Sequence, residues 1–188
     1  MECQLERMLA AYCAPTLAGI KTASLVACSR TRFPDLPLQI ARYQTAFAPR
    51  GLEFSVICVC RERFLLLVYH RQRLEKQLSD EQAVRLLKAF DYPMEQGVDA
   101  LLHHLEHRIK CGGSFPHEIG LFLGYPIEDV IGFIRNAGQG SKLTGYWKVY
   151  GDVEAASKCF DSFRRVKRAV TDRVERGESL LHVFAVAS

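Results

Sequence analysis

The sequence lacks a run of apolar residues long enough to cross a bilayer, which takes about 20 residues in a helix. It also lacks the basic residues that open a secretory signal peptide, because the chain begins Met1-Glu-Cys-Gln-Leu-Glu6. Internal repeats, low-complexity tracts and long linkers are missing too. We therefore expect one cytoplasmic domain over residues 1–188, with no membrane contact.

The cysteine pattern excludes a disulfide framework. The chain holds seven cysteines, an odd number, and they are scattered at positions 3, 13, 28, 58, 60, 111 and 159. The spacing Cys58-x-Cys60 also differs from the Cys-x-x-Cys of redox motifs. A reducing cytoplasm fits this usage best.

The sequence has little excess of positive over negative charge outside a single segment. The net charge is +4, and residues 158–176, with seven basic and three acidic side chains, account for all of it. Because aromatic residues do not interleave with these basic ones, we interpret the segment as a solvated helix face and do not expect nucleic-acid binding.

Apolar periodicity predicts an α+β fold with a small, mostly antiparallel sheet. The β-prone runs Glu53–Cys60 and Phe64–His70 flank Arg61-Glu-Arg63, which predicts a hairpin at about 53–70. Both runs lack a polar face, so we expect both strands to lie centrally under several helices. A long C-terminal amphipathic helix is predicted after Asp152, followed by a last strand over Leu180–Val186.

Further helices are predicted from capping residues and apolar stripes. One stripe contains Ala83, Leu86, Leu87 and Phe90. Two short helices are predicted to start at Pro116 and Pro126, and the second should direct Ile127, Val130, Ile131 and Ile134 inward. This pair resembles a helix-turn-helix, but Glu128 and Asp129 at the start of the second helix would repel phosphate, which disfavours DNA binding.

Residues 114–152 form the most informative region. It contains Phe115-Pro-His-Glu-Ile-Gly120 and Gly145-Tyr-Trp-Lys-Val-Tyr-Gly-Asp152. Together with Ala14–Leu25, these strings resemble the signature of a bacterial domain-of-unknown-function family, number 3793. The resemblance covers residues from about 8 to about 175.

The family's activity is not established, so the resemblance supplies no catalytic residue. Genes of this kind lie near flavodoxin-like redox genes in anaerobic Gram-positive bacteria. The resemblance therefore implies a redox or iron-related setting, with a flavodoxin-like protein as a partner.

His117 and Glu118 are the candidate catalytic residues. If they occupy the first turn of the Pro116 helix, the helix dipole favours the carboxylate and a neutral imidazole. A neutral imidazole beside a carboxylate can act as a base, a hydrogen-bond acceptor or a ligand. In the alternative, Glu118 only complements the dipole and His117 packs or caps.

Candidate ligand-binding residues come from the segment Tyr146–Tyr150, read as a strand. Alternation places Tyr146, Lys148 and Tyr150 on one face, suited to an acidic, planar ligand, and turns Trp147 and Val149 toward the core. The alternative is an exposed edge protected by Lys148. Three further residues complete the candidate set: Tyr125, Asp129 and Lys21.

A metal site is not expected. His103-His-Leu-Glu-His107 matches an inverted zinc-protease string, but its histidines lie opposite the apolar stripe of their helix and lack a third ligand downstream.

Two hypotheses follow. The first is a small-molecule site for an acidic or aromatic ligand or cofactor, which requires the start of the Pro116 helix to lie near Tyr146–Tyr150. The second is a non-catalytic regulatory or adaptor module that binds a protein partner through its helix pair. A concave polar pocket favours the first, and an apolar patch over the helices favours the second.

Overall fold

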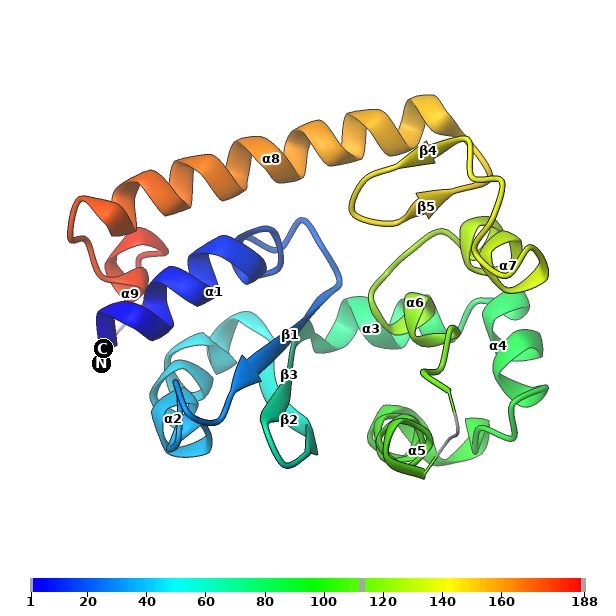
Figure 1. The fold of residues 1–188 in the computed structure, drawn as a ribbon, viewed down its shortest axis with the longest axis horizontal. Helices are drawn as coiled ribbons and strands as arrows, with labels where there is room; N and C mark the ends of the chain where they lie inside the picture. The colour runs from blue at the N-terminus through cyan, green and yellow to red at the C-terminus, as the bar shows by residue number, and fades with distance from the viewer. Residues whose placement is uncertain (1, 112–113, 187–188) are drawn as a thin grey trace. The chain divides into compact units, whose positions relative to one another are not determined.

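The computed structural model describes residues 2–111 and 114–186, and it confirms the predicted α+β class (Figure 1). It is 57% helical, with one three-stranded sheet and one two-stranded sheet. The chain forms two compact units. Unit 1 comprises Met1–Gln72 and Phe163–Ser188, and unit 2 comprises Arg73–Ser162. The expectation of one domain over residues 1–188 stays a prediction.

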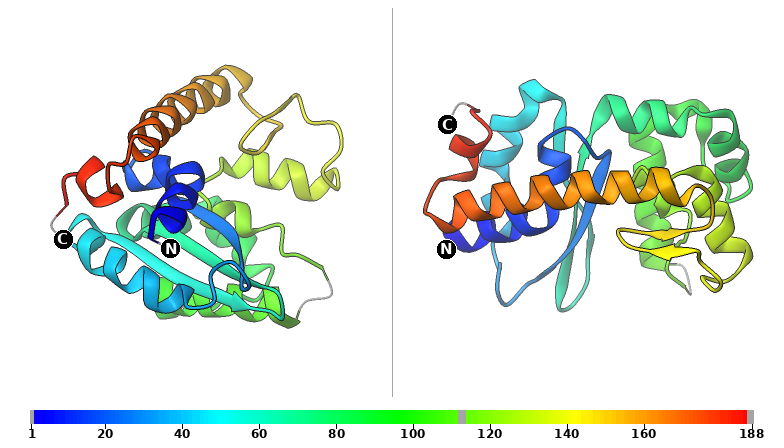
Figure 2. Two further views of the ribbon diagram at one scale, coloured as in Figure 1. Left: turned by 60° about the vertical axis from the view of Figure 1, so that its left-hand side comes forward. Right: turned by 90° about the horizontal axis from the view of Figure 1, so that it is seen from above.

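A three-stranded sheet with helices around it makes up unit 1. Its elements, in chain order, are α1 (Glu2–Leu17), β1 (Ala23–Ser29), α2 (Leu36–Phe47), η1 (Ala48–Arg50), β2 (Leu52–Val59), β3 (Arg63–His70), the end of α8 (Val153–Glu175) and α9 (Leu180–Val183). Residues of α1, α2 and the end of α8 share one apolar core with the sheet. Figure 2 shows α8 as one uninterrupted helix, with its second half beside α1.

The predicted hairpin is confirmed, because β2 and β3 pair antiparallel. The sheet order is β1-β3-β2, so β3 is the central strand. Leu66, Leu67 and Val68 of β3 are each 0% exposed, so both faces of that strand are covered. The expectation that both hairpin strands are central was wrong for β2, which lies at the edge because β1 occupies the other side of β3.

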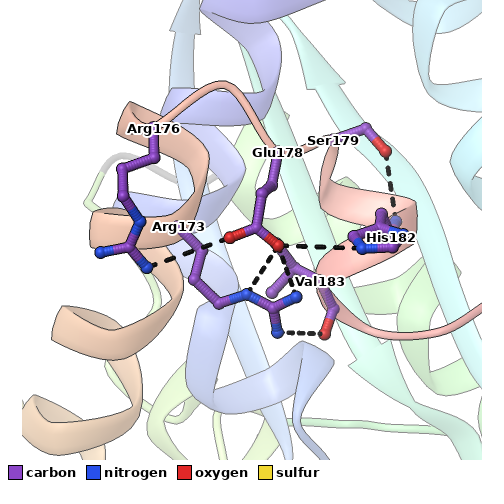
Figure 3. A network of polar contacts seen from close by, with 6 residues as sticks. All are labelled: Arg173, Arg176, Glu178, Ser179, His182 and Val183. Carbon is purple, nitrogen blue, oxygen red and sulfur yellow. Dashed lines mark hydrogen bonds and ion pairs between the residues drawn. The ribbon is translucent and has the colours of Figure 1, made fainter.

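The predicted last strand is instead the helical turn α9. Leu180 and Leu181 are both buried, and the backbone closes as a helical turn, because the Val183 N–H donates to the Ser179 carbonyl and the Phe184 N–H to the Leu180 carbonyl. The Ser179 hydroxyl caps the turn by accepting a hydrogen bond from the backbone N–H of His182. The Arg173 guanidinium donates to Glu178 Oε2 and to the Val183 carbonyl, which fixes the connection from α8 (Figure 3).

Unit 2 is mainly helical. Its elements are most of α3 (Arg71–Leu78), then α4 (Glu81–Lys88), η2 (Met94–Gln96), α5 (Gly97–Cys111), α6 (Ile119–Phe122), α7 (Ile127–Arg135), β4 (Leu143–Thr144), β5 (Lys148–Val149) and the start of α8. The Pro126 helix is confirmed as α7, which Pro126 caps.

The short helix that was predicted to start at Pro116 begins later, at Ile119. Residues 117–118 form a turn, and α6 has only the four residues Ile119–Phe122 before Gly124, whose φ of 76° ends it. Glu118 therefore occupies the N-cap position and His117 precedes it, and a helix of four residues supplies a smaller dipole than the predicted helix.

The Tyr146–Tyr150 segment is also less regular than predicted. Only Lys148 and Val149 are in β5, paired with Thr144 and Leu143, and residues 145–147 are bent. Side chains therefore alternate between the two faces of a strand only from Lys148 onward. Val149 is fully buried, as predicted, but Tyr146 packs against Phe160 as Trp147 does.

Candidate functional site

A cavity of about 310 Å³ lies in unit 2 between the α6–α7 region and the β4–β5 hairpin. We call it the aromatic cavity. The residues that line it are Phe115, His117, Ile119, Gly120, Tyr125, Asp129, Val130, Phe133, Thr144, Gly145, Trp147 and Lys148. The expected proximity of the Pro116 segment and the Tyr146–Tyr150 segment is confirmed, because both contribute to its wall.

Asp129 holds the hairpin against α7. Its carboxylate is 3% exposed and accepts three hydrogen bonds: 2.7 Å from Trp147 Nε1, 2.6 Å from the Tyr150 N–H and 2.8 Å from the Gly151 N–H. Asp129 is in the first turn of α7, where the helix dipole adds further stabilisation of negative charge. Both carboxylate oxygens thus accept hydrogen bonds from the hairpin, and Asp129 positions the hairpin instead of binding a ligand directly.

Two aromatic rings form one wall of the cavity. Tyr125 and Trp147 are stacked, with centroids 5.0 Å apart and planes 28° from parallel. The Tyr125 hydroxyl donates to the Tyr146 carbonyl at 3.2 Å, and burial raises its pKa to about 12. Tyr125 is therefore neutral at physiological pH and offers a ring face to a bound molecule.

Lys148 supplies a positive charge to this largely apolar cavity. Its Nζ donates to the Gly138 carbonyl at 2.6 Å and lies 5.9 Å from the centroid of Phe133. An ammonium group has three N–H donors, so two remain. Within the described part of the chain, Lys148 makes no ion pair, although its side chain is half-buried. An anion in the cavity would provide the missing counter-charge.

His117 lies at the exposed side of the same cavity. Its ring meets Phe133 edge to face, with centroids 5.0 Å apart. The His117 imidazole and the Lys148 ammonium group therefore both lie next to the phenyl ring of Phe133. Either ring nitrogen of His117 can form a hydrogen bond with a ligand there.

Glu118 points elsewhere. Its carboxylate is 1% exposed, forms an ion pair with Arg108 of α5 and accepts a hydrogen bond from the Tyr92 hydroxyl at 3.1 Å. Burial and the negative charge of Glu118 raise the pKa of Tyr92. Glu118 does not line the aromatic cavity, so the structure does not bring the predicted His117–Glu118 pair together as one reacting site.

Two other candidate residues lie outside the cavity wall. Lys21 belongs to unit 1, is 8% exposed and donates to the Ala23 carbonyl. Tyr150 reaches the site only through its backbone N–H, and its ring packs against Gly132. The cavity therefore contains His117, Tyr125, Asp129 and Lys148 of the predicted set.

Sequence reasoning missed several lining residues. Phe133 follows Asp129 by four residues on a helix, so it shares that face, and this spacing was the available signal. Trp147 packs against Phe160 of the core, as strand alternation predicted. The bend before β5 also brings it to the cavity wall beside Lys148, which alternation did not predict. The part played by Phe115, Thr144 and Gly145 depends on loop geometry, which no sequence pattern reveals.

The described residues include no group of three or more His, Cys, Asp or Glu side chains suited to a metal ion. The His103 side chain is 84% exposed, so this helix face does look to solvent as predicted. The expectation that the protein holds no zinc stays a prediction. Across residues 2–111 and 114–186, no helix combines the length and apolar character that a membrane span needs.

Comparison with models of known protein families assigns this chain to one family. A family model described as "Protein of unknown function (DUF3793)" matches residues 9–184. The chain belongs to the DUF3793 family. The predicted resemblance is thereby confirmed, and the match includes every residue of the aromatic cavity. No curated protein and no solved structure matches the chain significantly.

Proposed function

We propose that this DUF3793 protein binds a small, planar, acidic ligand in the aromatic cavity, with the ring against Tyr125 and Trp147 and the anionic group at Lys148. The observation that carries the proposal is the half-buried Lys148 ammonium. It faces an apolar, aromatic-lined cavity and has no ion-pair partner among the described residues.

The size of the cavity limits the ligand. A cavity of about 150 Å³ holds benzene, and the aromatic cavity measures about 310 Å³. A fused bicyclic aromatic acid is therefore a better fit than a dinucleotide. Asp129 does not repel such an anion strongly, because three N–H donors already surround its carboxylate.

Binding without catalysis is the function these contacts support best. Glu118, predicted to act with His117, is engaged by Arg108 and Tyr92. His117 is then a hydrogen-bonding group at the exposed side of the ligand. The cytoplasmic location, the redox or iron-related setting and the flavodoxin-like partner stay predictions.

Isothermal titration calorimetry tests the proposal with 2-naphthoate as the acidic probe and 2-naphthamide as its neutral counterpart. We expect 2-naphthoate to bind about tenfold more tightly, because a charge-assisted hydrogen bond at a half-exposed site contributes about 1.5 kcal/mol. Lys148→Met should remove that preference.

Lys142→Met is the matched control. Lys142 is in the segment leading to β4, and its Nζ also donates to a backbone carbonyl, that of Gly151 at 3.0 Å, but it does not line the cavity. Its loss should leave 2-naphthoate binding unchanged. Equal binding of naphthoate and naphthamide, or equal effects of the two lysine variants, would refute the proposal.

A further inference from the structure

The outer face of α7 leaves apolar side chains uncovered. Asp129, Val130 and Phe133 face the aromatic cavity, whereas Ile131 and Ile134 line a second depression on unit 2. The prediction that Ile131 and Ile134 point into the core was wrong, because only Asp129 and Val130 of α7 are buried. Leu86 of α4, from another predicted core stripe, is likewise only half-buried.

We call this depression the α4/α7 groove. Its volume is about 440 Å³, and its lining residues are Gln82, Arg85, Leu86, Ala89, Ile131, Ile134 and Arg135. The floor is aliphatic, and both arginines stand among the lining residues. An uncovered aliphatic surface bordered by charged groups is typical of a protein-interaction site.

The dimensions and walls of the groove favour a helical occupant. The eight residues of α4 and nine of α7 give walls about 12–14 Å long at about 1.5 Å per residue. Both walls are helices, so no strand edge is present in the groove to pair with an extended peptide. The groove also lacks an aromatic lining residue of the kind that proline-rich segments dock against. An amphipathic helix of two to three turns, with one apolar stripe on the aliphatic floor, therefore fits the groove best.

The charge of the groove selects an acidic occupant. Arg135 makes no ion pair among the described residues, whereas Arg85 pairs with Glu81. A second copy of the chain on this face would present the same lining residues, which include two arginines and no carboxylate. A homodimer would therefore bury guanidinium groups without a counter-charge from either groove. A partner segment with carboxylates beside its apolar stripe meets no such penalty.

We propose that the α4/α7 groove binds a short, acidic, amphipathic helix of a protein partner. Its aliphatic side chains contact Leu86, Ile131 and Ile134, and its carboxylates pair with Arg135 and, in part, with Arg85. The inference is independent of the aromatic cavity, because the two sites use opposite faces of α7.

Fluorescence anisotropy with two labelled synthetic helices tests the inference on the full chain. Both peptides carry leucine at positions i, i+3, i+4 and i+7, flanked by glutamate in one and by lysine in the other. We expect the glutamate peptide to bind and the lysine peptide to bind at least fivefold more weakly. Added salt should reduce the difference.

The variants are matched in charge. Arg135→Glu should weaken binding of the glutamate peptide about fivefold, the loss expected for about 1 kcal/mol of ion pairing. Lys88→Glu changes the net charge equally on exposed α4 surface outside the groove and should change binding less than twofold. Ile131→Ser with Ile134→Ser should abolish binding while circular dichroism and the thermal melt show a folded chain.

Three results would overturn the inference. They are failure of the glutamate peptide to bind, equal binding of both peptides, and equal effects of Arg135→Glu and Lys88→Glu. A dimer that sedimentation detects in the wild type but not in Ile131→Ser would assign the groove to a second copy and would refute it as well.

Discussion

Replacing Asp129 should destabilise the β4–β5 hairpin. In Asp129→Ala, three N–H donors lose their acceptor: the Trp147 indole and the backbone N–H groups of Tyr150 and Gly151. The hairpin that carries Trp147 and Lys148 then loses its main polar attachment to α7.

The magnitude follows from these three bonds. Each hydrogen bond to a charged group contributes about 1.5–3 kcal/mol. Removing the carboxylate also removes the cost of burying it, which offsets part of the loss. We expect Asp129→Ala to lower the free energy of unfolding by about 3–4 kcal/mol.

Asp129→Asn separates the individual contacts. Its amide oxygen can still accept from Tyr150 and Gly151 at the Oδ1 position, but its NH₂ group meets the Trp147 N–H, donor against donor. We expect a loss of about 2 kcal/mol, which lies between the values for wild type and Asp129→Ala.

Urea denaturation followed by circular dichroism measures these losses. Asp152→Ala is the control, because Asp152 caps α8 with one exposed bond to the Ala155 N–H at 3.0 Å and should cost about 1 kcal/mol. The reasoning fails if Asp129→Ala is no more destabilising than Asp152→Ala, or if the asparagine and alanine variants are equally unstable.

Three further predictions concern packing and pH. In Gly132→Ala, the new Cβ would lie 2.5 Å from the Cβ of Tyr150, so thermal melts should show a loss of about 1–3 kcal/mol from overpacking. Trp147→Ala should cost about 3–5 kcal/mol in the same assay, and a melt like that of the wild type would contradict its packing role. The hydrogen bond from Arg173 lowers the pKa of Glu178, so its stabilising effect is complete above the ordinary carboxyl pKa of about 4.3 and is lost as the pH falls through the depressed value. Melts of Glu178→Gln should therefore differ from wild type at pH 7 and converge with it in acid, and a pH-independent difference would contradict the ion pair.

The sheet and the longer helices were predictable because their signals are periodic. The stripe Leu36, Ile40, Tyr43 and Phe47 is buried along α2 as its spacing requires, and the hairpin was visible as two β-prone runs. Apolar spacing does not say whether a stripe is covered, however. Ile131 and Ile134 match a core pattern but line an open groove, because no described element packs over them.

The candidate site was only partly predictable. His117, Tyr125, Asp129 and Lys148 meet in one cavity, as the clustering of polar residues in the signature region suggested. The pairing of Glu118 with Arg108 was not predicted, because Arg108 lies ten residues earlier, in α5, and the sequence contains no local signal for the pair. Trp147 packs against the Val149–Phe160 core cluster as predicted, but it also lines the cavity, which alternation did not indicate because the segment before β5 is bent.

The most direct test of the central claim is a fluorescence titration of Trp147 with benzoate. Trp147 is the only tryptophan in the chain and lines the aromatic cavity, so its emission reports on that cavity alone. The proposed function predicts a saturable change in emission that benzamide does not reproduce and that Lys148→Met abolishes. A change that rises linearly with benzoate, or one that saturates equally in Lys148→Met, would contradict the proposal that Lys148 holds an acidic ligand there.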